Sequence, residues 1–126
     1  MSRAVEGSRA ASPASTVSSG ANRSKQYVFA RSLAPSDDPA VEIVSGDPVA
    51  FVRDLKQRSG GDIWLCGGGQ LAGHLLPEVD ELVVKVNPIV VGSGIPLADR
   101  SFDLQHFTLV DTTPIGAGVI MLRYTR

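Results

Sequence analysis

The stretch Asp62-Ile-Trp-Leu-Cys-Gly-Gly-Gly-Gln-Leu-Ala-Gly-His-Leu-Leu76 runs from a short apolar segment through three consecutive glycines into an amphipathic one. Its start predicts a strand over 62–66, and its end predicts a helix over 70–76 that Pro77 stops. Glycine has no Cβ, so the backbone at Gly67–Gly69 can turn sharply and approach a ligand closely. Unpaired N–H groups at the start of the helix favour an anion. The stretch therefore predicts a cradle for the phosphates of an anionic cofactor.

Length, charge and cysteine content narrow the class of protein. The chain has 126 residues, of which 43% are hydrophobic, and this supports one domain with a modest core. Residues 26–126 carry eight basic and twelve acidic side chains, so they lack the basic surface that binds nucleic acid. No apolar run is long enough to cross a membrane, and the single cysteine, Cys66, cannot form an internal disulfide. We expect a soluble cytoplasmic protein with no nucleic-acid or membrane partner.

The N-terminal region differs in composition from the rest of the chain. Residues 1–24 are rich in serine and alanine, contain no aromatic residue, and show neither helical nor strand periodicity. They are predicted to be a disordered low-complexity tail, with the folded domain over 25–126. Three arginines among many serines also fit an organelle transit peptide, but the amphipathic apolar face of such a peptide is missing.

The folded part alternates short apolar runs with helical stretches, which indicates an α/β sheet. Asp47 is a candidate N-cap, with Pro48 at the first position of a helix that ends near Arg58. The last two strands should form an antiparallel hairpin through the turn residues 112–117. The expected strands are 27–30, 41–44, 62–66, 82–86, 103–111 and 118–124.

Two common nucleotide motifs do not explain the glycines. Gly67-Gly-Gly69 with Ala72 satisfies the loose dinucleotide pattern, but the helix is short and no ribose-binding acid follows about 20 residues later. The strand before the glycines is also not the first of the domain. A Walker A loop is excluded because no Gly-Lys-Ser/Thr follows.

The order of motifs resembles the dihydrofolate-reductase-like family that contains the C-terminal reductase domain of riboflavin-biosynthesis deaminase-reductases, known as RibD. The resemblance is carried by the glycine run, by Val79-Asp-Glu-Leu82, by Asn87-Pro-Ile-Val-Val-Gly-Ser-Gly-Ile-Pro-Leu97 and by Lys25-Gln-Tyr-Val-Phe-Ala-Arg-Ser-Leu33. It implies a mostly parallel sheet with flanking helices and a C-terminal antiparallel hairpin. It also implies NADPH-dependent reduction of a small heterocyclic substrate, pyrimidine or pterin-like, by hydride transfer.

The resemblance also implies roles for individual residues. Gly67 and Gly68 would face the nicotinamide of NADPH, and Gly69, Gln70 and Leu71 would hold its pyrophosphate. Arg31 and Ser32 would bind the 2′-phosphate, and a guanidinium beside a hydroxyl is suited to discriminate NADPH from NADH. Hydride transfer is the chemistry of the cofactor, so no catalytic side chain is predicted.

The chain departs from the family in two places. Members that reduce the ribosylaminopyrimidine tend to carry a carboxylate just before the glycines, where this chain has Cys66. Members also begin with strands and helices that build the central sheet and the substrate cleft, whereas only the low-complexity tail precedes Lys25. This predicts a truncated or frame-disrupted member with an exposed sheet edge, and dimerisation through that edge or through the terminal strands. An intact reading frame at the locus would contradict a frame disruption.

Other candidate residues have plainer interpretations. Cys66 lies in an apolar strand and is expected to be a small buried hydrophobe. His74 and His106 lie far apart with no ligand at metal-binding spacing, so a core or surface role is expected for both and no metal site is predicted. Arg31 could equally be an ordinary exposed charge. Two functions remain open: a reductase, or a nucleotide-binding or oligomerising remnant that no longer catalyses a reaction.

Overall fold

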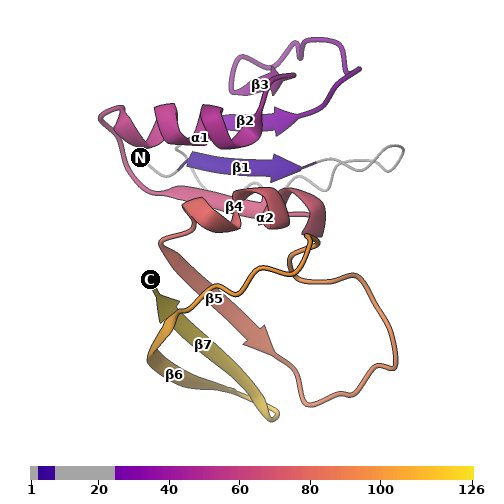
Figure 1. The fold of residues 1–126 in the computed structure, drawn as a ribbon, viewed down its shortest axis with the longest axis vertical. Helices are drawn as coiled ribbons and strands as arrows, with labels where there is room; N and C mark the ends of the chain where they lie inside the picture. Colours follow the sequence, from indigo (N-terminus) through magenta and orange to yellow (C-terminus); the bar gives the residue numbers. More distant parts are fainter. Residues whose placement is uncertain (1–2, 8–24) are drawn as a thin grey trace.

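The computed structural model describes residues 3–7 and 25–126, which form two sheets with helices packed on the first (Figure 1). The elements in chain order are strand β1 (Arg3–Gly7), β2 (Gln26–Phe29), β3 (Val41–Val44), helix α1 (Pro48–Gln57), β4 (Ile63–Gly67), helix α2 (Gly69–Leu75), the 3-10 turn η1 (Leu76–Glu78), β5 (Glu81–Val86), β6 (Thr108–Gly116) and β7 (Val119–Thr125). The expected α/β class is confirmed.

The first sheet is parallel, with strand order β3-β2-β1-β4. β1 lies inside it, because Val5 is in register with Tyr27 of β2 on one side and with Leu65 of β4 on the other. The prediction of a disordered tail over 1–24 is therefore wrong for residues 3–7, and the sheet does not lack its central strand. Pairing on both sides explains how so short a strand forms without a periodic pattern of its own. Residues 1–2 and 8–24 of the predicted tail lie outside the described residues.

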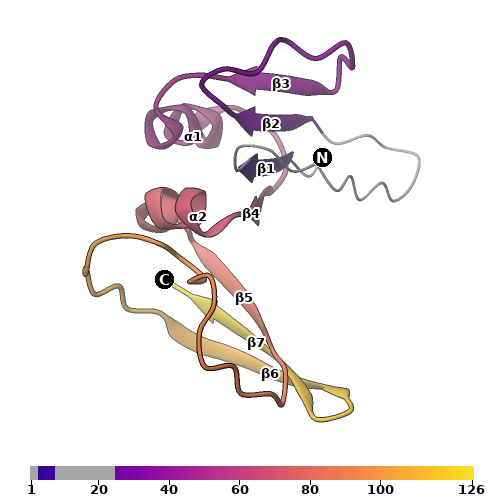
Figure 2. The ribbon, with the colours of Figure 1, turned by 90° about the vertical axis from the view of Figure 1, so that its right-hand side faces the viewer.

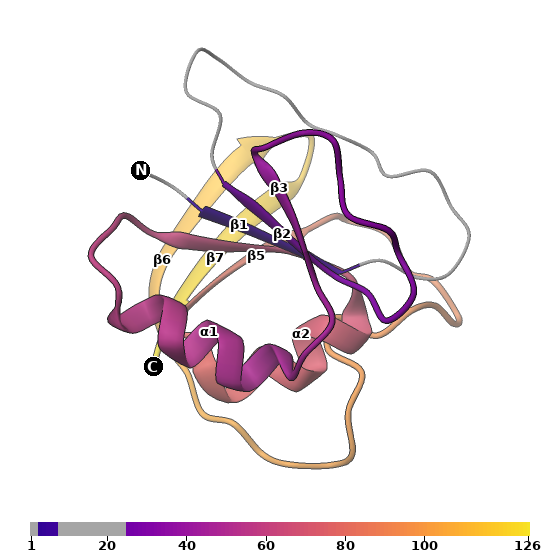
Figure 3. The same ribbon diagram turned by 90° about the horizontal axis from the view of Figure 1, so that it is seen from above.

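Helices α1 and α2 cover one face of the parallel sheet (Figure 3). Their contact with it is apolar. Val52 of α1 clusters with Leu71 and Leu75 of α2, and all three are buried. The ring of Phe51 makes edge contacts with two aromatic residues of β2, at 5.0 Å from Tyr27 and 5.6 Å from Phe29 between ring centroids. This core fixes the starts of both helices near the carboxyl ends of the strands.

Helix α1 begins as its sequence predicts. The Asp47 carboxylate accepts hydrogen bonds from the backbone N–H groups of Val49 at 3.1 Å and Ala50 at 3.3 Å. Pro48 occupies the first turn, where its missing N–H is not needed. The cap therefore satisfies two donors that the helix itself leaves unpaired.

Replacement of Asp47 by alanine should lower the free energy of unfolding by about 1 kcal/mol, because both N–H groups lose their acceptor. Urea unfolding followed by circular dichroism measures this change. Asp54→Ala is the matched control, since Asp54 forms an exposed ion pair with Arg58 and its loss should cost less than about 0.5 kcal/mol. Equal losses in the two variants would contradict the capping role.

The second sheet is antiparallel, with strand order β5-β7-β6 (Figure 2). The predicted sheet with a terminal hairpin is thus divided into two sheets. The hairpin turn is at Ala117 and Gly118, both with positive φ, and not over 112–117 as the turn residues suggested. A two-residue turn of this kind matches the twist of the strands. Pro114 is tolerated within β6 because β6 is an edge strand.

Ion pairs between charged side chains link helix α1 to the start of the second sheet and join two strands within that sheet. Arg53 and Lys56 of α1 form ion pairs of 2.7 Å with Glu78 and Asp80, which precede β5. Across the second sheet, Arg123 of β7 donates a 2.7 Å hydrogen bond to Glu81 of β5. This bond raises the pKa of the Arg123 guanidinium.

Candidate functional site

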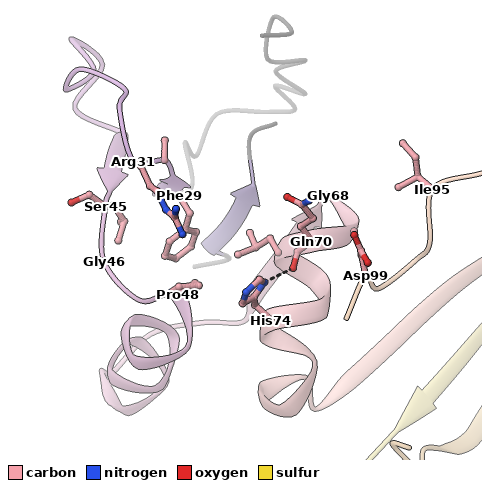
Figure 4. Close-up of a pocket in the computed structure, with 14 residues that line it drawn as sticks. Phe29, Arg31, Ser45, Gly46, Pro48, Gly68, Gln70, His74, Ile95 and Asp99 are labelled. Atoms are coloured by element: carbon pink, nitrogen blue, oxygen red, sulfur yellow. Dashed lines mark hydrogen bonds between the residues drawn. The ribbon is translucent and has the colours of Figure 1, made fainter. Parts of the chain in front are cut away.

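A pocket of about 570 Å³ lies where the parallel strands end and the helices begin (Figure 4). β2, β3 and β4 each contribute the residues at or just after their carboxyl ends. Such ends, at the point where the strand order reverses, are the usual binding place in open α/β sheets. The pocket is lined by Phe29, Ala30, Arg31, Val44, Ser45, Gly46, Pro48, Gly68, Gly69, Gln70, Leu71, His74, Ile95 and Asp99.

Four of these lining residues carry hydroxyl, imidazole or charged groups, and they come from four different segments. Arg31 follows β2, Ser45 follows β3, His74 is on α2, and Asp99 belongs to the loop between β5 and β6. Arg31 has no ion-pair partner within residues 3–7 and 25–126. Its guanidinium is therefore available to pair with an anionic ligand.

His74 is held in one orientation by its own helix. Its Nδ1 lies 2.8 Å from the backbone oxygen of Gln70, one turn earlier (Figure 4). A carbonyl can only accept, so Nδ1 carries the hydrogen. In the neutral ring this leaves Nε2 as a hydrogen-bond acceptor at the pocket wall.

The glycines of this region fall into two groups. A Cβ added at Gly67 or Gly68 would meet no atom within 4 Å, so the space beside these two residues is open. Gly67 also has φ of +120°, which disfavours other residues, and the Gly67–Gly68 peptide is cis. At Gly69 a Cβ would lie 2.5 Å from the backbone oxygen of Pro96, and at Gly73 it would lie 2.6 Å from the carbonyl carbon of Asp99. Gly69 and Gly73 must therefore be glycine because the backbone of residues 96–99 packs directly against them.

That contact seats the loop between β5 and β6 on helix α2. The Asp99 N–H donates to the backbone oxygen of Gly69 at 2.8 Å. Gly69 and Gly73 are one turn apart and lack side chains, so the loop backbone can lie directly on the helix. Ile95 and Asp99 form one wall of the pocket as a result.

The structure brings together most of the residues that the sequence proposed for cofactor binding. Arg31, Gly68, Gly69, Gln70 and Leu71 all line the pocket, although Leu71 is also part of the buried core. The other two proposed residues, Ser32 and Gly67, are not among its lining residues.

Sequence reasoning missed several lining residues. The turn at Ser45, Gly46 and Pro48 follows β3 just as the glycines follow β4, and the rule that ligands bind at the carboxyl ends of parallel strands could have identified it. His74 lines the pocket, where the sequence predicts only a core or surface role for it. The loop from Ile95 to Asp99 carries no local signal, because only the folded chain brings it to the helix.

One further expectation concerns β4. Cys66 was expected to be buried, but it is exposed. Trp64, on the same strand, is also exposed. Ile63 and Leu65 alternate with them and pack on the core, so the helices cover only one face of β4.

The described part of the chain contains neither a candidate metal site nor a candidate membrane-spanning helix. No group of three or more histidine, cysteine or acidic side chains that could hold a metal ion occurs within residues 3–7 and 25–126. Within the same ranges, neither length nor apolarity would let any helix cross a membrane.

Comparison with protein families and curated proteins identifies relatives. The family model described as the RibD C-terminal domain matches residues 4–121. Two uncharacterized proteins of Bacillus subtilis (strain 168) also match: YwjB is 35% identical and YyaP is 32% identical over 102 residues. Each match covers 79% of this chain. The chain spans 58% of the length of YwjB and 54% of that of YyaP.

Several solved structures share the fold of this chain. A protein of Shewanella sp. PV-4 with a provisional assignment to riboflavin biosynthesis superposes with a TM-score of 0.72 at 20% identity, covering 98% of this chain and 72% of that one. A second match is the Thermotoga maritima diaminohydroxyphosphoribosylaminopyrimidine deaminase/5-amino-6-(5-phosphoribosylamino)uracil reductase, with a TM-score of 0.58 at 17% identity. This match covers 81% of the present chain and 31% of the Thermotoga maritima chain. The expected dihydrofolate-reductase-like fold of the RibD type is therefore confirmed.

Proposed function

We propose, because the chain belongs to the RibD C-terminal domain family, that its pocket binds NADPH and that it acts as a reductase of a small heterocyclic substrate. The observation that carries this proposal is the convergence of Arg31, Gly68, Gly69 and Gln70 on one pocket at the ends of parallel strands. An available cation, further polar groups in the lining and glycines beside open space suit a phosphate-bearing ligand. The volume falls within the roughly 300–1,000 Å³ that is usual for small-molecule sites.

The chain supplies groups for different parts of the cofactor. Gly69 and Gln70 would hold the pyrophosphate at the start of α2, and Arg31 would hold the 2′-phosphate. The adjacent Ser32, which does not line the pocket, would need to turn toward the phosphate to add its hydroxyl. The nicotinamide would lie beside Gly67 and Gly68, where no side chain fills the space.

Reduction of the acceptor would require the protein to position the reactants and would require no reactive side chain. When bound, NADPH would supply the hydride for the acceptor, and solvent would supply the proton that completes the reduction. The protein would hold the ring against that acceptor, and the open backbone at Gly68 allows a close approach. The Thermotoga maritima neighbour is named as the reductase of a uracil derivative, and this supports a pyrimidine-type acceptor.

A second candidate is a nucleotide-binding protein without turnover. The chain spans less than two thirds of the length of each Bacillus subtilis relative, so the activity of a whole relative is not carried over to it. NADPH oxidation in the presence of a ribosylaminouracil phosphate or of dihydrofolate distinguishes the two. Turnover with either acceptor supports the reductase, and saturable binding without turnover supports the second candidate.

Arg31→Gln tests the cofactor assignment. Loss of a charged hydrogen bond to the 2′-phosphate should weaken NADPH binding about tenfold or more, while NADH binding should hardly change. Titration calorimetry with both nucleotides measures the difference. Arg58→Gln, at the far end of α1, is the control and should alter neither affinity. If wild-type protein fails to bind NADPH, or if Arg31→Gln weakens both nucleotides equally, this assignment is wrong.

A further inference from the structure

The pocket carries charges of opposite sign on its two sides. Of the described residues that line it, Asp99 is the only acid and Arg31 is the only arginine or lysine. Arg31 follows β2, whereas Asp99 belongs to the loop between β5 and β6. Figure 4 shows them on opposite sides of the first turn of α2, with Gly68 and Gln70 between them. A ligand that crosses the start of α2 therefore meets a cation at one end and a carboxylate at the other.

The carboxylate of Asp99 is available to a ligand. Within residues 3–7 and 25–126 it forms no ion pair or hydrogen bond. The next residue, Arg100, does not neutralise it, because the Arg100 guanidinium donates a 2.8 Å hydrogen bond to Asp103. The segment 86–98 before it contains no charged residue. Asp99 therefore presents an uncompensated negative charge to the pocket.

The backbone of Asp99, in contrast, is attached to α2. Its N–H donates to the backbone oxygen of Gly69 at 2.8 Å, and its backbone packs where Gly73 lacks a Cβ. The side chain takes no part in this attachment. Removal of the carboxylate should therefore leave the loop seated on the helix, so that an effect on binding can be assigned to the carboxylate itself.

The chemistry of a carboxylate limits what it can bind. An ionised carboxylate only accepts hydrogen bonds, and it repels a phosphate. In the proposed binding mode the 2′-phosphate lies at Arg31 and the pyrophosphate at Gly69 and Gln70. The next group along the cofactor, past the pyrophosphate, is the ribose of the nicotinamide nucleoside, and its two hydroxyls are hydrogen-bond donors.

We propose that Asp99 accepts a hydrogen bond from this ribose and thereby fixes the direction in which NADPH enters the pocket. The reversed direction would place the 2′-phosphate against the carboxylate and leave Arg31 without an anion, so it is disfavoured at both ends. Asp99 binds and orients the cofactor in this role and takes no part in hydride transfer. The inference rests on the proposed function and adds a specificity-determining residue to the same site.

Two shortened ligands locate the contact by titration calorimetry. 2′-Phospho-ADP-ribose keeps the ribose but lacks the nicotinamide, and 2′-phospho-ADP ends at the pyrophosphate. Asp99→Ala should weaken NADPH and 2′-phospho-ADP-ribose about tenfold or more, as expected for loss of a hydrogen bond to a charged group. Its affinity for 2′-phospho-ADP should be unchanged or higher, because no hydroxyl contact is lost and a repulsion is removed.

Three controls separate this contact from other effects. Asp99→Asn keeps an oxygen acceptor without the charge, so it should restore part of the affinity for NADPH. Asp62→Asn removes an exposed charge that precedes β4 and does not line the pocket, and it should leave all three affinities unchanged. Urea unfolding of ligand-free Asp99→Ala should match that of wild type.

Two results would overturn the inference while the cofactor assignment stands. One is an Asp99→Ala protein that binds all three ligands as wild type does. The other is an equal loss for all three, which would mean that the side chain only positions the loop. A wild-type protein that binds none of the ligands would instead overturn the proposed function, and this inference with it. The behaviour of wild type therefore distinguishes the two failures.

Discussion

Replacement of Gly68 by valine is expected to abolish NADPH binding without unfolding the protein. A Cβ at this position would meet no protein atom within 4 Å, and φ is −75°, which other residues adopt readily. The new side chain would instead project into the pocket that Gly68 lines. It would occupy the space that the cofactor needs for its close approach to the backbone. We expect the affinity to fall by at least about a hundredfold, since steric exclusion removes several contacts together.

Titration calorimetry combined with urea unfolding separates the two effects of this substitution. Affinity should be lost while the unfolding midpoint of the ligand-free protein moves little. Ala50→Val adds side-chain bulk at an exposed position of α1 that does not line the pocket, and it should keep wild-type affinity. Unchanged affinity in Gly68→Val would remove Gly68 from the cofactor site.

Local signals in the sequence predicted much of this fold. The strand over 41–44 is confirmed, and α1 begins at Pro48 behind the Asp47 cap, as expected. These elements are specified by periodicity and by capping residues that act within a few positions. Arg31 and the glycines were grouped through the family resemblance, and in the structure each follows a strand of the same parallel sheet.

Long-range pairing explains what the sequence did not reveal. β1 has no pattern of its own, and it is a strand because β2 and β4 pair with it on both sides. The hairpin turn was misplaced because Thr112, Pro114 and Gly116 are typical turn residues, yet they pair with β7 as an irregular edge strand. Cys66 was misjudged because the burial of an alternating strand depends on which of its faces is covered.

The wall formed by the β5–β6 loop also has no counterpart in the local sequence pattern. Gly73 looks like one more small residue in a short helix, but its missing Cβ makes room for a backbone from 26 residues further along the chain. The same sequence feature, a glycine in or beside α2, therefore serves ligand access at Gly68 and chain packing at Gly73. Only the neighbouring atoms distinguish the two roles.

Gly73→Ala should accordingly be strongly destabilising. In an ordinary helix this change would stabilise by about 1 kcal/mol, because alanine is the better helix former. Here the added methyl would meet the Asp99 backbone, with the carbonyl carbon at 2.6 Å and its oxygen closer still. Backbone atoms cannot rotate away as a side chain can, so the loop must be displaced. We expect the overpacking cost to prevail and the free energy of unfolding to fall by about 3 kcal/mol.

Urea unfolding of ligand-free protein measures this loss, with Gly46→Ala as the matched control. A Cβ at Gly46 would meet nothing within 4 Å, so that variant should be as stable as wild type or more stable by about 0.5 kcal/mol. Displacing Asp99 should also weaken NADPH binding, because the same loop forms the pocket wall. A Gly73→Ala protein as stable as wild type would mean that the loop does not rest on α2, and the pocket would then lose the wall that Ile95 and Asp99 supply.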